Sequence, residues 1–221
     1  MKFQRLMLWS AALLMLAAST ILTFAQSAAT LPADVKPDSL ARLPYVQRKD
    51  LNEADQKIFD VLPGRTAAGT LGGPLAFAAY NPGVAKALFD LHNAAVAGTL
   101  DAHVRELAIL VACRETNYSL EWNGHEATAL RSGVDQKVID VIRQNGPLTG
   151  VNEADAAVIR FGRQLYTDRK VDSATFAKIV ARYGQRGAMD MVAVMNTYAV
   201  SGFYGIAVDE HAAAGKTSLR K

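Results

Sequence analysis

The stretch from residue 106 to residue 133, ELAILVACRETNYSLEWNGHEATALRSG, decides the fold. Apolar side chains recur at helical spacing in and just before its first half, which predicts a helix over about 102–115. Asn117 and Ser119 are residue types that favour the N-cap of a helix, and Gly133 is typical of the position just past a helix C-terminus. The stretch therefore predicts two consecutive helices joined by a short turn.

Four candidate reactive side chains fall within this stretch. Glu121 and His125 are four residues apart, so they share one face of the second helix, and Tyr118 lies at its entrance. Glu106 lies in an otherwise apolar helix, where a carboxylate needs a partner, which favours either a site or a buried ion pair. A carboxylate beside an imidazole predicts acid–base chemistry, because each group shifts the pKa of the other. The alternative is that Glu121 and His125 form only a surface ion pair.

Several motifs in and around this stretch resemble the carboxymuconolactone decarboxylase family, which shares its fold with the alkylhydroperoxidase AhpD. The motifs are R-E-L-A-I-L at 105–110, Y-x-x-E-W-x-x-H at 118–125, the Gly133-Val134 exit, A-R-L-P-Y at 41–45, G-G-P-L at 72–75 and N-P-G-V-A at 81–85. The resemblance covers roughly 40–208. It implies an all-α, AhpD-like domain of about seven helices that forms a homo-oligomer, a trimer or hexamer, with sites near subunit contacts.

The resemblance also shows that the two thiols needed for peroxidase chemistry are absent from the matching positions of this sequence. AhpD-like peroxidases use two thiols three residues apart, a histidine four residues after the second thiol, and an upstream glutamate. His125 and Glu106 match the last two, but Tyr118 and Glu121 stand at the thiol positions. Cys113 lies five residues before Tyr118 and cannot replace either thiol, so a thiol peroxidase is not expected.

What remains resembles the decarboxylase branch, which implies acid–base chemistry on a small carboxylated, lactone-type substrate without a metal or organic cofactor. In this interpretation His125 delivers or removes a proton at carbon, and Glu106 or Glu121 orients the imidazole. Tyr118 donates a hydrogen bond to a carbonyl or developing enolate. A non-catalytic, oligomeric binding protein of the cell envelope is the alternative from another functional class.

Two further residues are candidates for substrate binding. Arg105 is a candidate to hold a substrate carboxylate, although it points about 100° away from its neighbour Glu106 around the helix. Trp122 is a candidate wall of the site, with a core or subunit-interface aromatic as the alternative. His103 is three residues from Glu106 and is a weaker candidate for the same site.

The other titratable residues predict no further site. His92 and His211 lie in alanine-rich segments and are interpreted as structural or exposed. The acidic residues and histidines do not follow the H-E-x-x-H pattern or the paired E-x-x-H pattern of metal sites, so no metal is expected. The single cysteine, Cys113, excludes an intramolecular disulfide; it is either a small buried residue or a reactive thiol.

The N-terminus carries a targeting signal. Lys2 and Arg5 precede an apolar run to Phe24, and small residues precede Gln26. This pattern predicts a signal peptide over 1–25 and therefore an exported protein, periplasmic or secreted. The alternative is that the segment is not cleaved and anchors the protein in the membrane. Loss of these two cations lowers the formal charge of +3 to near +1. We therefore expect no nucleic-acid partner, and no stable membrane insertion after leader removal.

The mature chain divides into an extended N-terminal arm over 26–50, a helical domain over 51–215 and a C-terminal tail over 216–221. Capping residues and breakers in the domain predict further helices. Helices are predicted after Asn52, over Pro74–Tyr80, from Pro82 to about Ala97, and after Asp101, Asp135 and Asn152. Two more are predicted, one after Asp172 or Ser173 and one from about Arg186 to Val208. The glycine-rich stretch 64–74 shows no helical pattern and is a candidate pocket rim.

Overall fold

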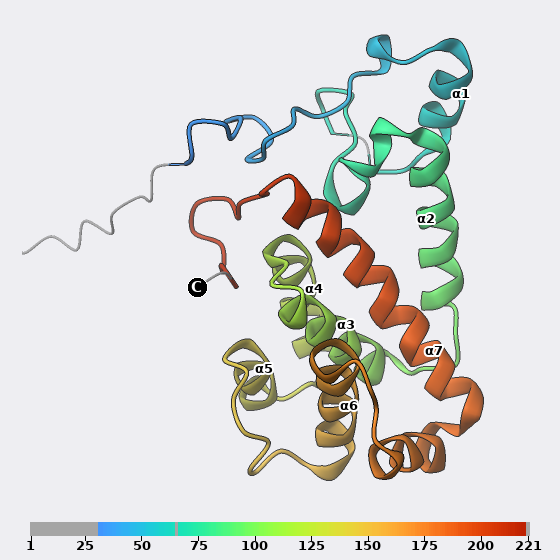
Figure 1. Ribbon diagram of the computed structural model, residues 1–221, viewed down its shortest axis with the longest axis vertical. Helices are drawn as coiled ribbons and strands as arrows, with labels where there is room; N and C mark the ends of the chain where they lie inside the picture. Colours follow the sequence, from blue (N-terminus) through green and yellow to red (C-terminus); the bar gives the residue numbers. More distant parts are fainter. Residues whose placement is uncertain (1–30, 65, 220–221) are drawn as a thin grey trace, which may run out of the picture. The chain divides into compact units, whose positions relative to one another are not determined.

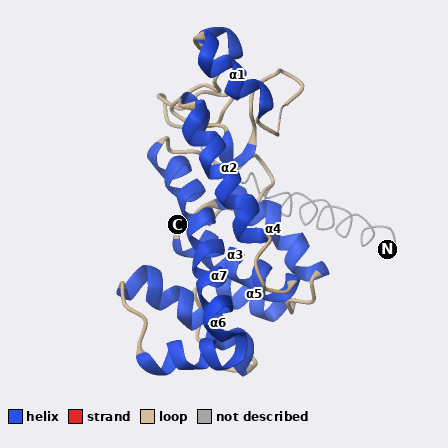
Figure 2. Ribbon diagram, turned by 90° about the vertical axis from the view of Figure 1, so that its right-hand side faces the viewer, coloured by secondary structure: helices blue, strands red, loops and turns tan. Residues whose placement is uncertain are grey.

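The computed structural model describes residues 31–64 and 66–219, and this part of the chain is helical without a strand (Figure 2). The prediction of an all-α fold is confirmed, whereas the predicted signal peptide lies outside the described residues. The helices are α1 (Glu53–Val61), α2 (Pro82–Val96), α3 (Ala102–Glu115), α4 (Ser119–Arg131), α5 (Gln136–Arg143), α6 (Glu153–Arg163) and α7 (Ser173–Ala207). Among the described residues, none of these helices is both long and apolar enough to cross a membrane.

Most helices begin where a polar side chain caps free backbone N–H groups. Asn or Asp accepts a hydrogen bond from the backbone N–H three residues later, or two residues later in α5, and each such cap contributes about 1 kcal/mol. The capping residues are Asn52, Asn81, Asp101, Asp135, Asn152 and Asp172. The predicted starts of these helices are confirmed, because capping depends on local sequence alone.

The start of α4 differs from the prediction that Asn117 or Ser119 caps it. Asn117 adopts a left-handed conformation, with φ of 51°. Its N–H donates to the Arg114 carbonyl and the Tyr118 N–H donates to the Cys113 carbonyl, so Asn117 ends α3 in a Schellman motif. The Ser119 hydroxyl accepts the Leu219 N–H instead of capping the helix. Neither side chain therefore caps α4, whose N-cap is Tyr118 without a side-chain hydrogen bond.

The predicted helix over Pro74–Tyr80 is also wrong. This segment contains two short 3-10 turns, Gly73–Leu75 and Ala78–Tyr80. Gly73, with φ of 66°, begins the first turn in a conformation that L side chains rarely adopt. The glycine-rich stretch before it is irregular, as predicted.

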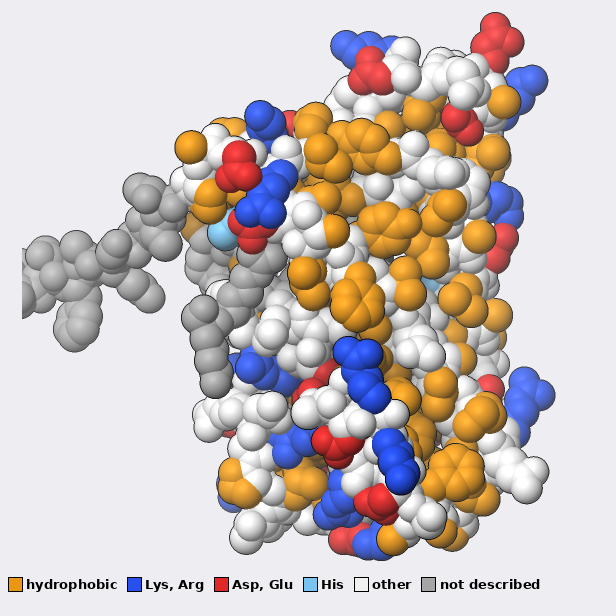
Figure 3. Space-filling view, in the orientation of Figure 1, with side chains coloured by type: hydrophobic (Ala, Val, Ile, Leu, Met, Phe, Trp, Pro, Cys, Tyr) orange, Lys and Arg blue, Asp and Glu red, His pale blue; other side chains and the backbone are white. Residues whose placement is uncertain are grey.

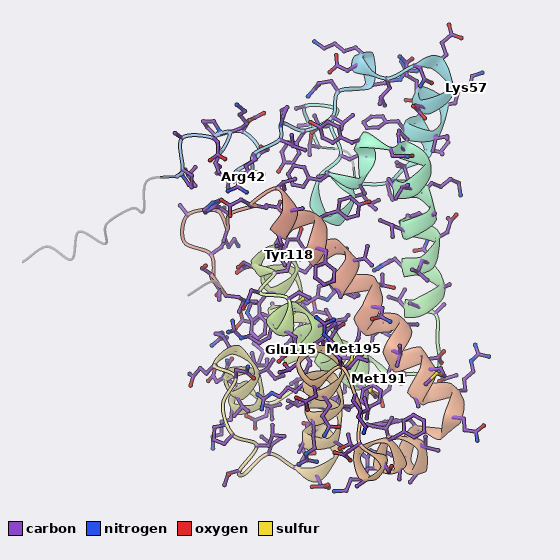
Figure 4. All side chains as sticks on the ribbon, viewed as in Figure 1. Arg42, Lys57, Glu115, Tyr118, Met191 and Met195 are labelled. Carbon is purple, nitrogen blue, oxygen red and sulfur yellow. The ribbon has the colours of Figure 1, made fainter. Side chains whose placement is uncertain are left out.

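The last helix has two segments that meet at Gly184, whose φ of 71° and ψ of 173° are not helical. Met191 and Met195 are fully buried on the side of α7 that faces the centre of the molecule (Figure 4). Phe176 and Met189 of the same helix are 42% and 54% exposed. Met189 is two positions before Met191 and thus points about 200° away from it around the helix.

Helix α3 is the centre of the fold. It packs against α4, α5, α6 and α7, and residues 106–113 are buried on every side (Figure 1). A second apolar cluster joins α1 and α2 to the 3-10 turns, with Phe59 fully buried in it. The two clusters leave room between α2, α4 and α7 for the site.

Both ends of the described chain are tied to the helical domain. In the predicted arm, the Arg42 N–H donates to the Val208 carbonyl, and the His211 N–H donates to the Leu40 carbonyl. In the predicted tail, Leu219 is 3% exposed and Arg114 donates to its carbonyl. These contacts hold the segment after α7 against α4.

Gly162 of α6 tests the packing around α3. A Cβ atom at this position would overlap Val111 Cγ1 and lie 3.1 Å from Met195 Cε. We expect Gly162→Ala to lower the free energy of unfolding by about 1–3 kcal/mol, because overpacking strains a close-packed core. Urea unfolding followed by circular dichroism measures the change.

The matched control is Gly124→Ala, on an exposed part of α4 where a Cβ atom would meet nothing within 4 Å. It should raise the free energy of unfolding by about 0.5–1 kcal/mol, because alanine favours helix over glycine. Equal effects of the two substitutions would contradict the close approach of α6 to α3.

Candidate functional site

A cavity of about 390 Å³ lies where α2, α4 and α7 meet the glycine-rich stretch. Its wall combines apolar side chains with two histidines and one carboxyl group. The lining residues are Pro63, Gly64, Gly72, Leu75, Leu88, Phe89, His92, Glu121, His125, Thr197, Tyr198 and Ser201. Glu121 and His125, which were predicted from their spacing on α4, are therefore both in the pocket. The glycine-rich stretch contributes to its rim.

Glu106 of α3 holds the His125 ring from behind. Its Oε2 lies 2.8 Å from His125 Nδ1, and Glu106 itself is only 5% exposed. The residues that follow Glu106 on α3, from Leu107 to Cys113, are apolar and buried, and His125 is the hydrogen-bond partner that this buried carboxylate needs. An ionised Glu106 accepts a hydrogen bond from the Nδ1–H group, which leaves the lone pair on Nε2.

Glu121 lies on the other side of the same imidazole. Its Oε2 is 3.6 Å from His125 Nε2, beyond hydrogen-bonding distance, and its buried Oε1 has no hydrogen-bond partner among the described residues. Burial raises the pKa of Glu121 to about 7, and the negative charge of Glu210 also raises it, while His125 opposes the rise. Glu121 therefore exchanges a proton near neutral pH.

The three residues together form an acid–base unit. His125 offers a basic nitrogen, Glu106 fixes the ring and stabilises its protonated form, and Glu121 supplies a proton at neutral pH. Glu121 and the Nε2 side of His125 meet the same cavity, so one substrate can contact both.

Two residues of the pocket were not predicted as site residues. The Tyr198 ring meets the His125 ring edge-on, with centroids 4.9 Å apart, and meets the His92 ring with centroids 5.6 Å apart. Burial raises the pKa of Tyr198, so its phenol stays protonated. Tyr198 was interpreted only as an inward-packing residue, and His92 as structural or exposed. Their place in the site depends on how α2 and α7 pack beside α4, for which the sequence carries no local signal.

Tyr118 lies apart from the pocket lining. Its hydroxyl donates to Glu210 Oε2 at 2.9 Å, and its ring lies against Gly205, where a Cβ atom would overlap it. Burial and the charge of Glu210 raise the pKa of Tyr118 well above its ordinary value. Tyr118 therefore connects α4 to the segment after α7 (Figure 4).

The two predicted substrate-binding residues also lie outside the lining. Trp122 is fully buried in the core, where its Nε1 donates to Glu126 Oε2 at 3.0 Å and the Arg143 guanidinium lies over its ring. Arg105 is half-buried and does not line the cavity. The structure thus brings together three of the six predicted residues, Glu106, Glu121 and His125.

The remaining candidates have other partners. His103 pairs with Asp155 at 2.8 Å and does not reach the pocket. Cys113 is fully buried, and burial raises the pKa of its thiol well above the ordinary value, so the nucleophilic thiolate is disfavoured. Within the described residues, no three or more His, Cys, Asp or Glu side chains are grouped so that they could hold a metal ion.

Comparison with known proteins agrees with the architecture. Residues 82–161 match the sequence model of the Carboxymuconolactone decarboxylase family. No curated protein matches the chain. Among solved structures, the chain is similar to the debrominase Bmp8 in a cysteine-to-alanine variant bound to 2,3,4-tribromopyrrole. The TM-score is 0.55 at 16% identity, over 79% of this chain and 91% of that chain. At this identity the likeness shows the fold alone.

Replacing Glu121 with glutamine tests whether the pKa of this buried carboxyl group is raised. The pKa of Glu121 rises from 4.5 to about 7 on folding, so the folded state binds more protons than the unfolded state between these values. The free energy of unfolding of the wild type therefore falls as pH rises through this range, by about 3 kcal/mol. Because glutamine does not titrate, Glu121→Gln should gain that amount relative to the wild type between about pH 4 and pH 8.

Urea unfolding of both proteins at the two pH values measures this gain. Comparing differences between pH values removes any constant effect of burying an amide in place of a carboxyl group. The same wild-type-to-variant difference at both pH values would show that Glu121 has no raised pKa.

Proposed function

We propose that this chain, whose residues 82–161 match the model of the Carboxymuconolactone decarboxylase family, is an enzyme that moves a proton at carbon without a metal or organic cofactor. The observation that carries this proposal is the unit of Glu106, His125 and Glu121 at one cavity. The pKa of about 7 for Glu121 suits this role, because proton transfer is most efficient near the working pH.

The geometry supports a definite division of roles. His125 Nε2 takes a proton from a carbon next to a substrate carbonyl, and the electron pair of that C–H bond forms the carbon–carbon double bond of an enol. The carbonyl π pair takes the proton of Glu121 as it becomes the enol oxygen–hydrogen bond. Glu106 stabilises the imidazolium through its hydrogen bond to Nδ1. Return of the protons completes the cycle.

Decarboxylation of a small carboxylated lactone is the second candidate, favoured by the family match. The bond between the ring carbon and the carboxylate breaks, its electron pair moves toward the carbonyl, and carbon dioxide leaves. The carbonyl oxygen takes the proton of Glu121, which gives an enol. Protonated His125 then delivers its own proton to that carbon, and the enol oxygen gives its proton back to Glu121 as the carbonyl re-forms. Arg105 lies outside the cavity lining, so His125 takes over the carboxylate contact that was predicted for Arg105.

The size of the cavity supports a ring-sized substrate for either reaction. A volume of about 390 Å³ suits a small molecule, and the similar debrominase is described in complex with a small brominated ring. A thiol peroxidase is disfavoured because Cys113 is buried and Glu121 and Tyr118 stand at the thiol positions. An envelope binding protein stays as the non-enzymatic alternative.

We also propose that the protein is exported and forms a homo-oligomer. Large apolar side chains are exposed on α2 and α7, among them Leu91 at 45%, Phe203 at 58% and Ile206 at 44%. Apolar side chains cover much of the face in Figure 3, including the part over α7. Such surface is typical of a subunit contact.

Activity of His125 variants tests the proposed function. The mature protein is offered a panel of carboxylated lactones, uncharged lactones and β-keto acids, with absorbance, carbon dioxide release and hydrogen–deuterium exchange at carbon as readouts. We expect His125→Ala to reduce turnover about 100- to 10,000-fold, because it removes the general base. Glu106→Gln should reduce it by a smaller factor, because glutamine still positions the ring.

His211→Ala is the control, because His211 pairs with Asp209 outside the pocket and should leave turnover unchanged. Exchange without carbon dioxide release would favour proton transfer over decarboxylation. Full turnover by His125→Ala would contradict the assignment of the base. Binding of panel compounds without exchange or turnover would favour the binding protein.

A further inference from the structure

We propose that His92 is a second substrate-binding residue, which donates a hydrogen bond to a substrate oxygen in the cavity that it lines together with Glu121. The pocket would then select ring-sized compounds that carry two oxygen functions. This inference rests on the proposed function only in taking the cavity as the substrate site. It adds a binding residue and a substrate class to that site.

His92 differs from the other histidines of the described chain in having no carboxylate partner. The other three each have a carboxylate oxygen within 3.2 Å: His103 with Asp155, His125 with Glu106 and His211 with Asp209. Among the described residues, His92 makes a ring contact with Tyr198 and no hydrogen bond. Its ring nitrogens are therefore available to a ligand in the cavity that it lines.

The polar groups of the cavity come from different helices. Glu121 and His125 come from α4, and His92 comes from α2, which lies on the other side of α7 in Figure 1. Tyr198 of α7 contacts both imidazole rings and also lines the cavity. A flat ring against Tyr198 would thus be within reach of His92 from α2 and of the acid–base unit from α4.

The rest of the cavity wall is largely apolar. Leu75, Leu88 and Phe89 line it together with the Tyr198 ring. Such a wall favours the faces of a carbon ring, and the few polar groups then fix its orientation. Glu121 and His92 are two of these polar groups, and His92 has no hydrogen-bond partner among the described residues.

The protonation of His92 suits a hydrogen bond to an uncharged oxygen. Burial lowers the pKa of His92, and the charge of His125 lowers it further, so the ring is neutral at pH 7. A neutral imidazole keeps one N–H group and can polarise a carbonyl without transferring its proton. Protonated Glu121 offers the same kind of donor at the reacting end. The two donors together match a ring with two carbonyl oxygens.

Binding of two probes tests this match without requiring turnover. Cyclohexane-1,4-dione has two opposed carbonyl groups, and cyclohexanone is the same ring with one. At pH 7 we expect the wild type to bind the dione about five- to tenfold more tightly, the contribution of one further hydrogen bond. Ligand-observed NMR titration gives both dissociation constants.

Variants of His92 then test whether its N–H group causes the preference for the dione over cyclohexanone. His92→Phe keeps a ring against Tyr198 but removes the donor, so the dione and cyclohexanone should bind with about equal affinity. His92→Gln restores an N–H donor and should keep part of the preference. His211→Gln, outside the pocket, should keep all of it. Circular dichroism and the Tm of each variant confirm that it is folded.

Lack of a preference for the dione in the wild type would overturn the inference, as would an undiminished preference in folded His92→Phe. The outcome is separate from that of the proposed function. If His92→Phe loses the preference but the lactone panel shows no turnover, His92 is a binding residue and the enzymatic proposal fails. If the panel is turned over and no preference exists, the enzymatic proposal stands and the role of His92 fails.

Discussion

The hydrogen bond between Glu106 and His125 is the interaction on which the rest of the site depends. It joins α3, the central helix of the core, to α4, the helix that carries the pocket residues. A carboxylate that is 5% exposed among apolar side chains is costly unless it is paired, so the fold constrains the position of His125 as strongly as function does. This bond sets the ring orientation, and the ring orientation decides which nitrogen meets the cavity.

The two positions at which related peroxidases carry thiols have separate roles in this chain. Glu121 stays at the cavity and, by its burial, becomes an acid that titrates near neutral pH. Tyr118 instead turns to Glu210, and the small size of Gly205 makes room for its ring. The second position has thus become a structural contact with the segment after α7. Of the two positions, only Glu121 thus lies at the cavity.

Sequence reasoning succeeded where the cause of a structure is local. Side-chain caps such as Asn52 and Asp101 start helices through bonds to their own next turn, and the four-residue spacing of Glu121 and His125 places both on one face. It failed where distant segments decide. Ser119 accepts the backbone N–H of Leu219, and Tyr118 donates to Glu210, which lies 92 residues later. Neither contact can be read from the residues around 118–119.

The same reasoning explains why half of the pocket was missed. His92 and Tyr198 belong to helices that meet α4 only in the folded chain, so no motif joins them to His125. Their rings nevertheless form one continuous set of contacts, from His92 through Tyr198 to His125 and then to Glu106. His92 and Glu121 line the same cavity from different helices. In the proposed function, a hydrogen bond from His92 would fix where the substrate lies relative to the proton of Glu121, and in a cavity with mostly apolar walls such positioning would determine which carbon reacts.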